Sequence, residues 1–259
     1  MMKTMMKNML IAMCVITICH VSLYAGEKKV KNDACKKQLK GVVHLSDNDV
    51  RFKTAKGMVI FVDPVNGPES DGVVKSGFDK PDLILITHPH GDHFQPDVIK
   101  AYLKLNPKAE LAGPADVVEQ AKASGISNIK SVKPGKSFTM RGIDIETVPA
   151  CFLEGDSHPQ ASNWVGYVLN INDGRYYVTG DTQPLPGMEK IKADVIFPLL
   201  YGCGGNLDAA LKMTKLSGAK LAVPVHYGNQ VETVKKFIVG LPEGVQGVYF
   251  ENSLLMASK

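Results

Sequence analysis

Apolar and polar positions along the chain predict short strands that alternate with a few helices. A continuous apolar run over 82–87 is typical of a strand buried on both faces, and the alternation over 136–149 is typical of strands with one face in a core. The turn Asn172-Asp173-Gly174 between two apolar runs predicts a β-hairpin. Strands are expected over 41–45, 49–54, 58–62, 82–87, 109–112, 136–149, 164–171, 175–179, 193–199, 221–225 and 245–250, with a loop over 66–77.

Helices are expected between some of these strands. Pro96 and Pro114 are placed to begin the first two, and Asn206 is placed to cap the third. No repeat, linker or change of composition divides residues 41–259, so the mixture predicts one layered α/β (α+β) domain. The helices are expected over 96–105, 114–124, 206–216 and 231–239.

The first 25 residues have the features of a secretory signal peptide. Lys3 and Lys7 precede an apolar stretch over 9–23, and its 15 residues fall short of the roughly 20 that a spanning helix needs. Ala25 offers a small residue for cleavage; an uncleaved N-terminal helix is the alternative. We therefore expect a signal peptide over 1–25, a polar lead-in over 26–40 and an exported protein, periplasmic or secreted, with no stable membrane anchor.

Composition and charge narrow the range of partners. With 44% hydrophobic and 22% charged residues, the chain has the composition of a globular protein rather than a disordered one. Its formal charge of +4 falls to +2 when Lys3 and Lys7 leave with the signal peptide, and the remaining charge is scattered along the chain. Because this pattern offers no basic groove, nucleic acid is not expected as a partner.

Three of the seven histidines fall within residues 88–93, directly after the long apolar run. In an extended chain His88 and His90 point to one side, Asp92 continues that spacing, and His93 comes from the adjacent turn. The carboxyl end of a buried strand is where α/β folds place their sites. Imidazoles with a carboxylate suit Zn²⁺, Mn²⁺ or Fe²⁺, so this loop predicts a metal site.

The run His88-Pro-His90-Gly-Asp92-His93 resembles the HxHxDH signature of the metallo-β-lactamase superfamily. The other motifs of that family have counterparts in the same order between residues 63 and 226. They are an Asp at a strand end, a lone His, an Asp after a strand and a late His, matched by Asp63, His158, Asp181 and His226.

Within the superfamily, the chain most resembles the branch that contains ascorbate-6-phosphate lactonase and N-acylphosphatidylethanolamine phospholipase D. The resemblance rests on His158-Pro159 followed by the Trp164-Val-Gly-Tyr-Val run, on His44 ahead of the Asp63 motif, and on the Gly204-Gly205-Asn206 turn.

The resemblance implies a four-layer αββα sandwich with a dinuclear metal site along one edge. It implies two divalent cations as cofactors, with Zn²⁺ expected first and Mn²⁺ or Fe²⁺ as alternatives, and a hydroxide between them as the nucleophile. Asp92 would also assist proton transfer to the leaving group. The implied ligands are His88, His90 and His158 for the first metal, Asp92, His93 and His226 for the second, and Asp181 as the bridge.

The expected function is that of a metal-dependent hydrolase that cleaves an ester, lactone or phosphoester of a small molecule. Metallo-β-lactamases proper lack the bridging Asp that this chain has in Asp181, which argues against antibiotic hydrolysis. One alternative is an enzyme with a single iron, of the sulfur dioxygenase type, which a count of bound metals distinguishes. Another is a non-catalytic periplasmic metal-binding protein, which is disfavoured because every ligand position is filled.

Further residues are expected near the site. Asp63 is expected to hydrogen-bond the ligand loop rather than bind metal. His44 is expected either to touch the substrate or orient a ligand, or to be a structural histidine. Tyr201 and Tyr227, each followed by Gly at a strand end, are candidates for the mouth of the site, whereas Trp164 is expected mainly in the core.

Three cysteines remain after removal of the signal peptide, too few for a disulfide scaffold and without a CxxC spacing. By the resemblance, Cys151 and Cys203 each follow a strand that ends at the active-site edge. They are therefore expected either to form one bridge or to remain as two buried free thiols, with Cys35 free near the N-terminus.

Overall fold

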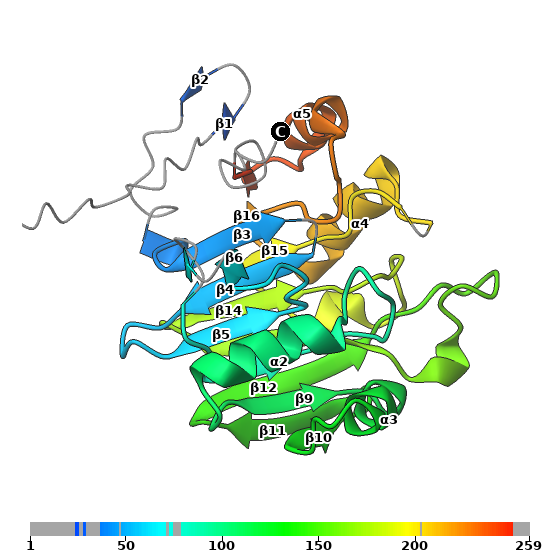
Figure 1. The fold of residues 1–259 in the computed structure, drawn as a ribbon. Helices are drawn as coiled ribbons and strands as arrows, with labels where there is room; N and C mark the ends of the chain where they lie inside the picture. Colours follow the sequence, from blue (N-terminus) through cyan, green and yellow to red (C-terminus); the bar gives the residue numbers. More distant parts are fainter. Residues whose placement is uncertain are drawn as a thin grey trace, which may run out of the picture.

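In the computed structural model, two β-sheets pack face to face and helices cover the outer face of each sheet (Figure 1). The structure describes residues 24–25, 28–29, 37–46, 48–70, 73–74, 79–202 and 204–250. Residues 1–23 of the expected signal peptide, which was predicted over 1–25, lie outside these ranges. Cys35 and Cys203 also lie outside them. No helix within the described ranges has the length and apolar character needed to cross a membrane.

The first sheet has six strands in the order β10-β9-β8-β5-β4-β3. β3, β4 and β5 pair antiparallel, whereas β5, β8, β9 and β10 pair parallel. The carboxyl ends of the parallel strands therefore share one edge of the sheet. The bounds are β3 Val42–Ser46, β4 Asp49–Lys53, β5 Val59–Val62, β8 Leu83–Leu85, β9 Glu110–Gly113 and β10 Ile129–Ser131.

The second sheet has seven strands in sequence order, β11 to β17. The first four form an antiparallel meander, and β14 to β17 pair parallel, so their carboxyl ends also meet at one edge. The bounds are β11 Lys136–Met140, β12 Ile143–Pro149, β13 Val165–Ile171, β14 Gly174–Val178, β15 Val195–Phe197, β16 Leu221–Ala222 and β17 Gln246–Gly247.

Side chains of the central strands alternate between two buried layers. In β8, Leu83 and Leu85 face the second sheet, whereas Ile84 packs with the helices on the outer face. In β15, Val195 and Phe197 face the first sheet. Because both faces are buried, these strands read as unbroken apolar runs. The expected four-layer αββα sandwich is confirmed.

The four expected helices each begin and end within one residue of the predicted bounds. α2 begins at Pro96, and Asn206 caps α4 by accepting a hydrogen bond from the backbone N–H of Ala209 (2.9 Å). Gly218 ends α4 with a φ of 72°. α2 and α3 pack on the first sheet, and α4 and α5 on the second (Figure 1). The bounds are α2 Pro96–Leu105, α3 Ala115–Ala123, α4 Leu207–Ser217 and α5 Val231–Gly240, with two 3-10 turns, η1 Gln160–Ser162 and η2 Met188–Lys190.

Some short elements were not expected from the sequence. β6, Glu69–Ser70, and β7, Val73–Val74, form a small antiparallel pair within the expected loop. β10 adds an edge strand whose residues are mostly exposed, so no apolar alternation marks it. Ahead of the sandwich, β1, Tyr24–Ala25, pairs antiparallel with β2, Lys28–Lys29.

Candidate metal centre

The histidine loop leaves the carboxyl end of β8, in the middle of the first sheet. The carbonyl of His90 accepts hydrogen bonds from the backbone N–H groups of His93 (2.9 Å) and Phe94 (2.8 Å), which closes a tight turn. As expected, His93 comes from this turn and lies beside His88, with 3.8 Å between the ring centroids. Pro96 then begins α2, so the loop has a rigid element at each end.

The second sheet supplies the remaining expected ligands from the matching edge. His158 lies in the loop before β13, where its carbonyl accepts a hydrogen bond from the N–H of Phe152 (2.9 Å). Asp181 follows β14, and His226 follows β16. Because β14, β15 and β16 are parallel neighbours, the last two residues are delivered to one edge.

Two glycines leave room for this arrangement. Gly180 has a φ of +61°, and a Cβ there would lie 3.1 Å from the Cβ of Thr87, across the gap between the two sheets. Gly202 has a φ of +83°, and its Cβ would lie 2.9 Å from Cε1 of the His226 ring. His226 itself has a φ of 55°, which is uncommon for a residue with a side chain.

All seven expected ligands converge. They form three overlapping groups, and within each group the candidate ligand atoms lie within 4.8 Å of one another. The groups are His88 with His90 and His158, His88 with His93 and Asp181, and Asp92 with His93 and His226.

The spacing and the donor atoms fit divalent cations. Two ligand atoms bound to one tetrahedral cation at about 2.0–2.1 Å lie about 3.3 Å apart. The Nε2 atoms of His88 and His158 are 3.3 Å apart, and Asp181 Oδ1 lies 3.2 Å from His93 Nε2. Both carboxylate oxygens of Asp181 are buried and accept no hydrogen bond within the described part of the chain. A buried carboxylate needs a positively charged partner, which a divalent cation or the protonated ring of His93 can supply.

Asp181 stands between the two halves of the group. Its Oδ2 lies 3.5 Å from the Nε2 atoms of both His158 and His226. The Nε2 atom of His226 also lies 3.2 Å from Oδ2 of Asp92. One carboxylate oxygen therefore lies equally close to a histidine of the triad and to a histidine of the Asp92 group, and the other oxygen lies near His93.

The electrostatics of the centre favour the charge states that metal ligands need. Burial lowers the pKa of His88 well below its ordinary value and also lowers the pKa of His90, so both imidazoles are neutral. Burial alone would raise the pKa of Asp181, but the nearby His93 and His158 outweigh it and hold that pKa well below its ordinary range. Neutral imidazoles and ionised carboxylates are the metal-binding forms.

His93 behaves differently. Burial alone would lower its pKa, but the carboxylates of Asp181 and Asp63 outweigh burial and raise the pKa of His93 to about 10. Without a cation, this imidazole therefore holds an extra proton at neutral pH, on the side where a metal would bind.

Asp63 supports the ligand loop through its contacts with Thr87 and His93. It accepts hydrogen bonds from the N–H of Thr87 (2.7 Å) and the hydroxyl of Thr87 (2.6 Å), and its Oδ2 lies 2.8 Å from Nδ1 of His93. A carboxylate on the far nitrogen of a ligand histidine sets its tautomer and orientation. Asp63 is absent from the three ligand groups, in keeping with its expected supporting place.

The sequence reasoning missed Asn48. This residue is 4% exposed, and its Nδ2 lies 2.8 Å from Nε2 of His93 and 3.3 Å from the carbonyl oxygen of Asp92. An amide can present nitrogen to an unprotonated imidazole or oxygen to a protonated one. No motif marks Asn48, because it reaches the site only through the packing of the β3–β4 turn.

Trp164, expected mainly in the core, is buried but also belongs to the centre. Its ring centroid lies 4.9 Å from those of His88 and His90 and 5.1 Å from that of His158. Its position just before β13 was visible in the sequence, but the neighbours of its ring were not.

The other expected residues are not members of the three ligand groups. His44 is 2% exposed, and its Nδ1 lies 3.5 Å from the hydroxyl of Tyr227, which is itself buried at 6% exposure. Tyr227 was expected at the mouth of the site and instead packs against His44. Tyr201 is half exposed, and its N–H donates to the carbonyl of His226 (3.0 Å). Cys151 is a buried free thiol, while its expected partner Cys203 lies outside the described residues.

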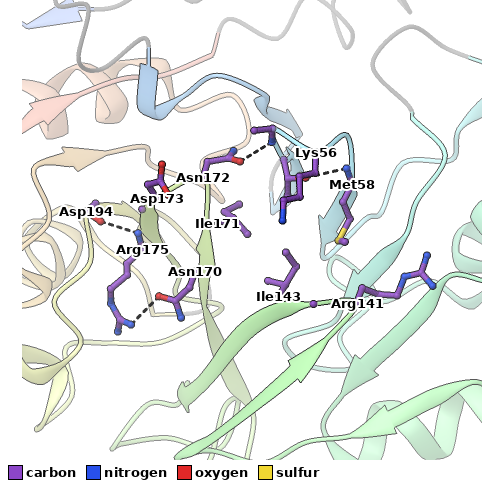
Figure 2. A pocket seen from close by; sticks show the side chains of 14 residues that line it. Lys56, Met58, Arg141, Ile143, Asn170, Ile171, Asn172, Asp173, Arg175 and Asp194 are labelled. Atoms are coloured by element: carbon purple, nitrogen blue, oxygen red, sulfur yellow. Dashed lines mark hydrogen bonds between the residues drawn. The ribbon is translucent and has the colours of Figure 1, made fainter.

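A cavity of about 770 Å³ lies at the opposite end of the sandwich, where β14 begins (Figure 2). Met58, Ile143 and Ile171 point into it. Some of its polar groups have partners: Asn172 accepts from the N–H of Ala55, and Arg175 pairs with Glu146 beside the cavity. None of the residues lining it is a histidine or cysteine, and none belongs to a possible metal-binding group found among the described residues.

Comparison with known proteins agrees with this geometry. The sequence profile described as the beta-lactamase superfamily domain matches residues 59–227, which span the whole ligand set. A UPF0173 protein of Pyrococcus abyssi is 32% identical over 177 residues, covering 67% of this chain and 77% of that protein. A UPF0173 metal-dependent hydrolase of Methanopyrus kandleri is 27% identical over 182 residues, covering 66% and 77%.

A solved structure shows the same fold. It is described as a metal-dependent hydrolase from Parabacteroides distasonis, with a TM-score of 0.67 and 25% identity, covering 81% of this chain and 92% of that one. The matched profile, the shared fold and the converging ligand motifs agree. The chain therefore belongs to the metallo-β-lactamase superfamily and resembles relatives named metal-dependent hydrolases.

Proposed function

We propose that this metal-dependent hydrolase of the metallo-β-lactamase superfamily works with two divalent cations and cleaves an ester, lactone or phosphoester of a small molecule. The first cation would be held by His88, His90 and His158. The second would be held by Asp92, His93 and His226. Asp181 would be shared between the two cations.

The state of Asp181 carries this proposal. Both of its oxygens are buried without a hydrogen bond from the described residues, and between them they face histidines of both groups. A carboxylate within reach of histidines of both groups would be shared if two cations were held there. When bound, such a pair supplies a hydroxide nucleophile near neutral pH and polarises the scissile oxygen. Zn²⁺ suits this set of nitrogen and oxygen ligands.

The exposure of the ligand residues separates those that only hold the centre from those that a substrate can reach. His88, His93, His158 and Asp181 are at most 1% exposed, so they hold the centre without meeting the substrate. The Asp92 side chain is 48% exposed, and that of His226 is 15% exposed. A substrate therefore approaches on the Asp92 side.

Asp92 is the residue placed to handle a proton. Its hydrogen bond with His226 holds its pKa below the ordinary value, so the carboxylate is ionised and accepts protons only transiently. One oxygen lies 3.2 Å from His226, while the side chain remains half exposed toward incoming substrate. An ionised carboxylate in this place could take the proton released by the attacking water and pass it to the leaving group.

The test is metal analysis of the purified protein, followed by assays with lactone, phosphodiester and thioester substrates. Two divalent metals per chain with hydrolysis of one substrate class support the proposal. One iron per chain with oxygen consumption would replace it with the single-iron alternative. Tight metal binding without turnover on any substrate would favour the binding-protein alternative.

We also propose that the protein is exported, on the strength of its N-terminal segment alone. N-terminal sequencing of the protein recovered from a periplasmic or culture fraction tests this. A mature start near residue 26 supports export, and an intact Met1 in the cytosolic fraction contradicts it.

A further inference from the structure

Trp164 is the only tryptophan in the chain, and it packs against all three histidines of the first metal group. Its ring is tilted by 34° against His88 and meets His90 and His158 nearly at right angles, at 78° and 81°. The side chain is 7% exposed. One aromatic ring therefore limits the rotation of three imidazoles at once.

Trp164 is held by hydrogen bonds at both its side chain and its backbone. Its Nε1–H donates to Oδ2 of Asp116 at 2.6 Å, and the other oxygen of Asp116 accepts from the N–H of Val117. On the backbone side, the carbonyl of Trp164 accepts from the N–H of Ala150 (3.0 Å). Asp116 lies in the first turn of α3, so this helix is joined to the histidines through one side chain.

His158 shows why this packing matters. A ligand histidine usually donates its second nitrogen to a carboxylate or carbonyl, which sets the direction of the ring. Nδ1 of His158 is buried and has no hydrogen-bond partner in the described ranges, whereas Nδ1 of His88 lies 3.0 Å from the hydroxyl of Thr87. The orientation of His158 therefore rests on the rings around it, which are those of Trp164, Phe152, His88 and His90.

We propose that Asp116 and Trp164 are positioning residues of the first metal site: Asp116 fixes the indole, and the indole fixes the imidazoles that would hold the cation. The inference rests on the proposed function, because it assumes that these histidines bind metal. It adds a pair of residues outside the ligand motifs and assigns a role to the first turn of α3.

The experiment measures Co²⁺ binding to metal-free full-length protein by chelator competition and by tryptophan emission. An open-shell cation at the first site quenches Trp164, so in the wild type the emission should fall with one equivalent of Co²⁺. Asp116→Ala should weaken first-site binding by about 10- to 100-fold, the usual range for residues that support a metal ligand. Binding at the second site should change little.

A double-mutant cycle tests whether Asp116 acts through the indole N–H. Trp164→Phe keeps a ring against the histidines but has no N–H, so Asp116→Ala should have no further effect on first-site affinity in that background. In the Phe variants the affinity is followed by the Co²⁺ absorption spectrum instead of emission. Asp97→Ala is the matched control, because Asp97 lies in the first turn of α2, is exposed and contacts only Lys100 among its described ion pairs.

The outcomes separate the inference from the proposed function. If the wild type binds no Co²⁺, the proposed function fails. If the wild type binds two equivalents and Asp116→Ala binds the first as tightly as Asp97→Ala does, the positioning role is wrong and the proposed function stands. If Asp116→Ala weakens binding equally in the Trp and Phe backgrounds, Asp116 does not act through Trp164. Thermal unfolding of each metal-free variant shows whether the fold is retained.

Discussion

Asp181 is the residue at which the two ligand groups meet, since its Oδ2 lies 3.5 Å from both His158 and His226 and its Oδ1 lies 3.2 Å from His93. An amide in its place would lose the negative charge that offsets two dications and would turn one acceptor into a donor.

We therefore expect Asp181→Asn to lose the second metal and to lower turnover by at least about 100-fold, with the fold retained. Metal content and hydrolysis rate, measured on the same preparation, check this. Asp173→Asn, in the exposed turn at the other end of the sandwich, is the control and should match the wild type. Two tightly bound metals with full turnover in Asp181→Asn would contradict the bridging assignment.

Asp63 has a different place, because it touches the ligand loop and not the ligand groups. Asn at this position would turn an NH₂ toward either the Thr87 N–H or the nitrogen of His93. We expect Asp63→Asn to lower the free energy of unfolding by about 1–3 kcal/mol and to reduce activity less than Asp181→Asn does. Urea unfolding monitored by circular dichroism, with a parallel rate assay, tests the order. A greater loss of activity than in Asp181→Asn would place Asp63 among the ligands.

The protonation of His93 makes metal binding depend on pH. In the metal-free protein its pKa is raised to about 10, so between pH 7 and pH 9 a metal must displace a proton from this ring. Affinity for the second metal should therefore rise about tenfold per pH unit in this window and level off near pH 10. Chelator competition at several pH values measures this, and His93→Gln should abolish the slope. An affinity that does not change from pH 7 to pH 9 would show that His93 is already neutral.

The turns after the parallel strands set the orientation of the candidate ligand side chains. Gly202, in the turn after β15, is tightly packed, because a Cβ would lie 2.9 Å from the His226 ring. We expect Gly202→Ala to displace that ring and to weaken second-site metal binding by about tenfold or more. Metal titration of the variant is the measurement.

Gly187→Ala provides the matched control for this turn. Gly187 has a similar positive φ, 92° against 83°, but a Cβ there would meet nothing within 4 Å. Both variants therefore lose about 1–2 kcal/mol of stability to backbone strain, and only Gly202→Ala should also lose metal. Equal metal binding by the two variants would contradict the steric account.

The sequence predicted most elements because local signals and burial agreed. α2 has the predicted bounds, with Pro at its first position, and α4 has the predicted cap and stop. β10 and the β6–β7 pair were missed, since β10 is mostly exposed and the pair has only two residues a strand. An edge strand needs only backbone pairing with its neighbour, which leaves no hydrophobic period to detect.

In the whole molecule, the centre joins the two sheets. The loop at 88–93 belongs to the first sheet, whereas His158, Asp181 and His226 belong to the second. Bound cations would therefore link the two sheets, and anything that binds only the folded state stabilises it.

Removing the metals should consequently lower the melting temperature. With free metal at 100 times its dissociation constant, one site contributes about 2.7 kcal/mol of stability, which a chelator removes. Differential scanning calorimetry with and without EDTA measures the loss. Asp181→Asn should show a smaller shift than the wild type, and an unchanged melting temperature in the wild type would mean that the cations do not link the sheets.

The residue types and their order along the chain were enough to predict which seven candidate ligands converge, because His and Asp are chemically distinctive and these follow apolar strands. They were also enough for the layered fold, since strands buried on both faces need helices on their outer sides. Asn48, Asp116 and the ring contacts of Trp164 came only from the tertiary structure. These residues are ordinary in type and distant in sequence from the histidines, and their roles depend on which side chains the packing of two sheets brings into contact. The same packing buried Tyr227 against His44, because a strand-end position alone does not say which way a side chain turns.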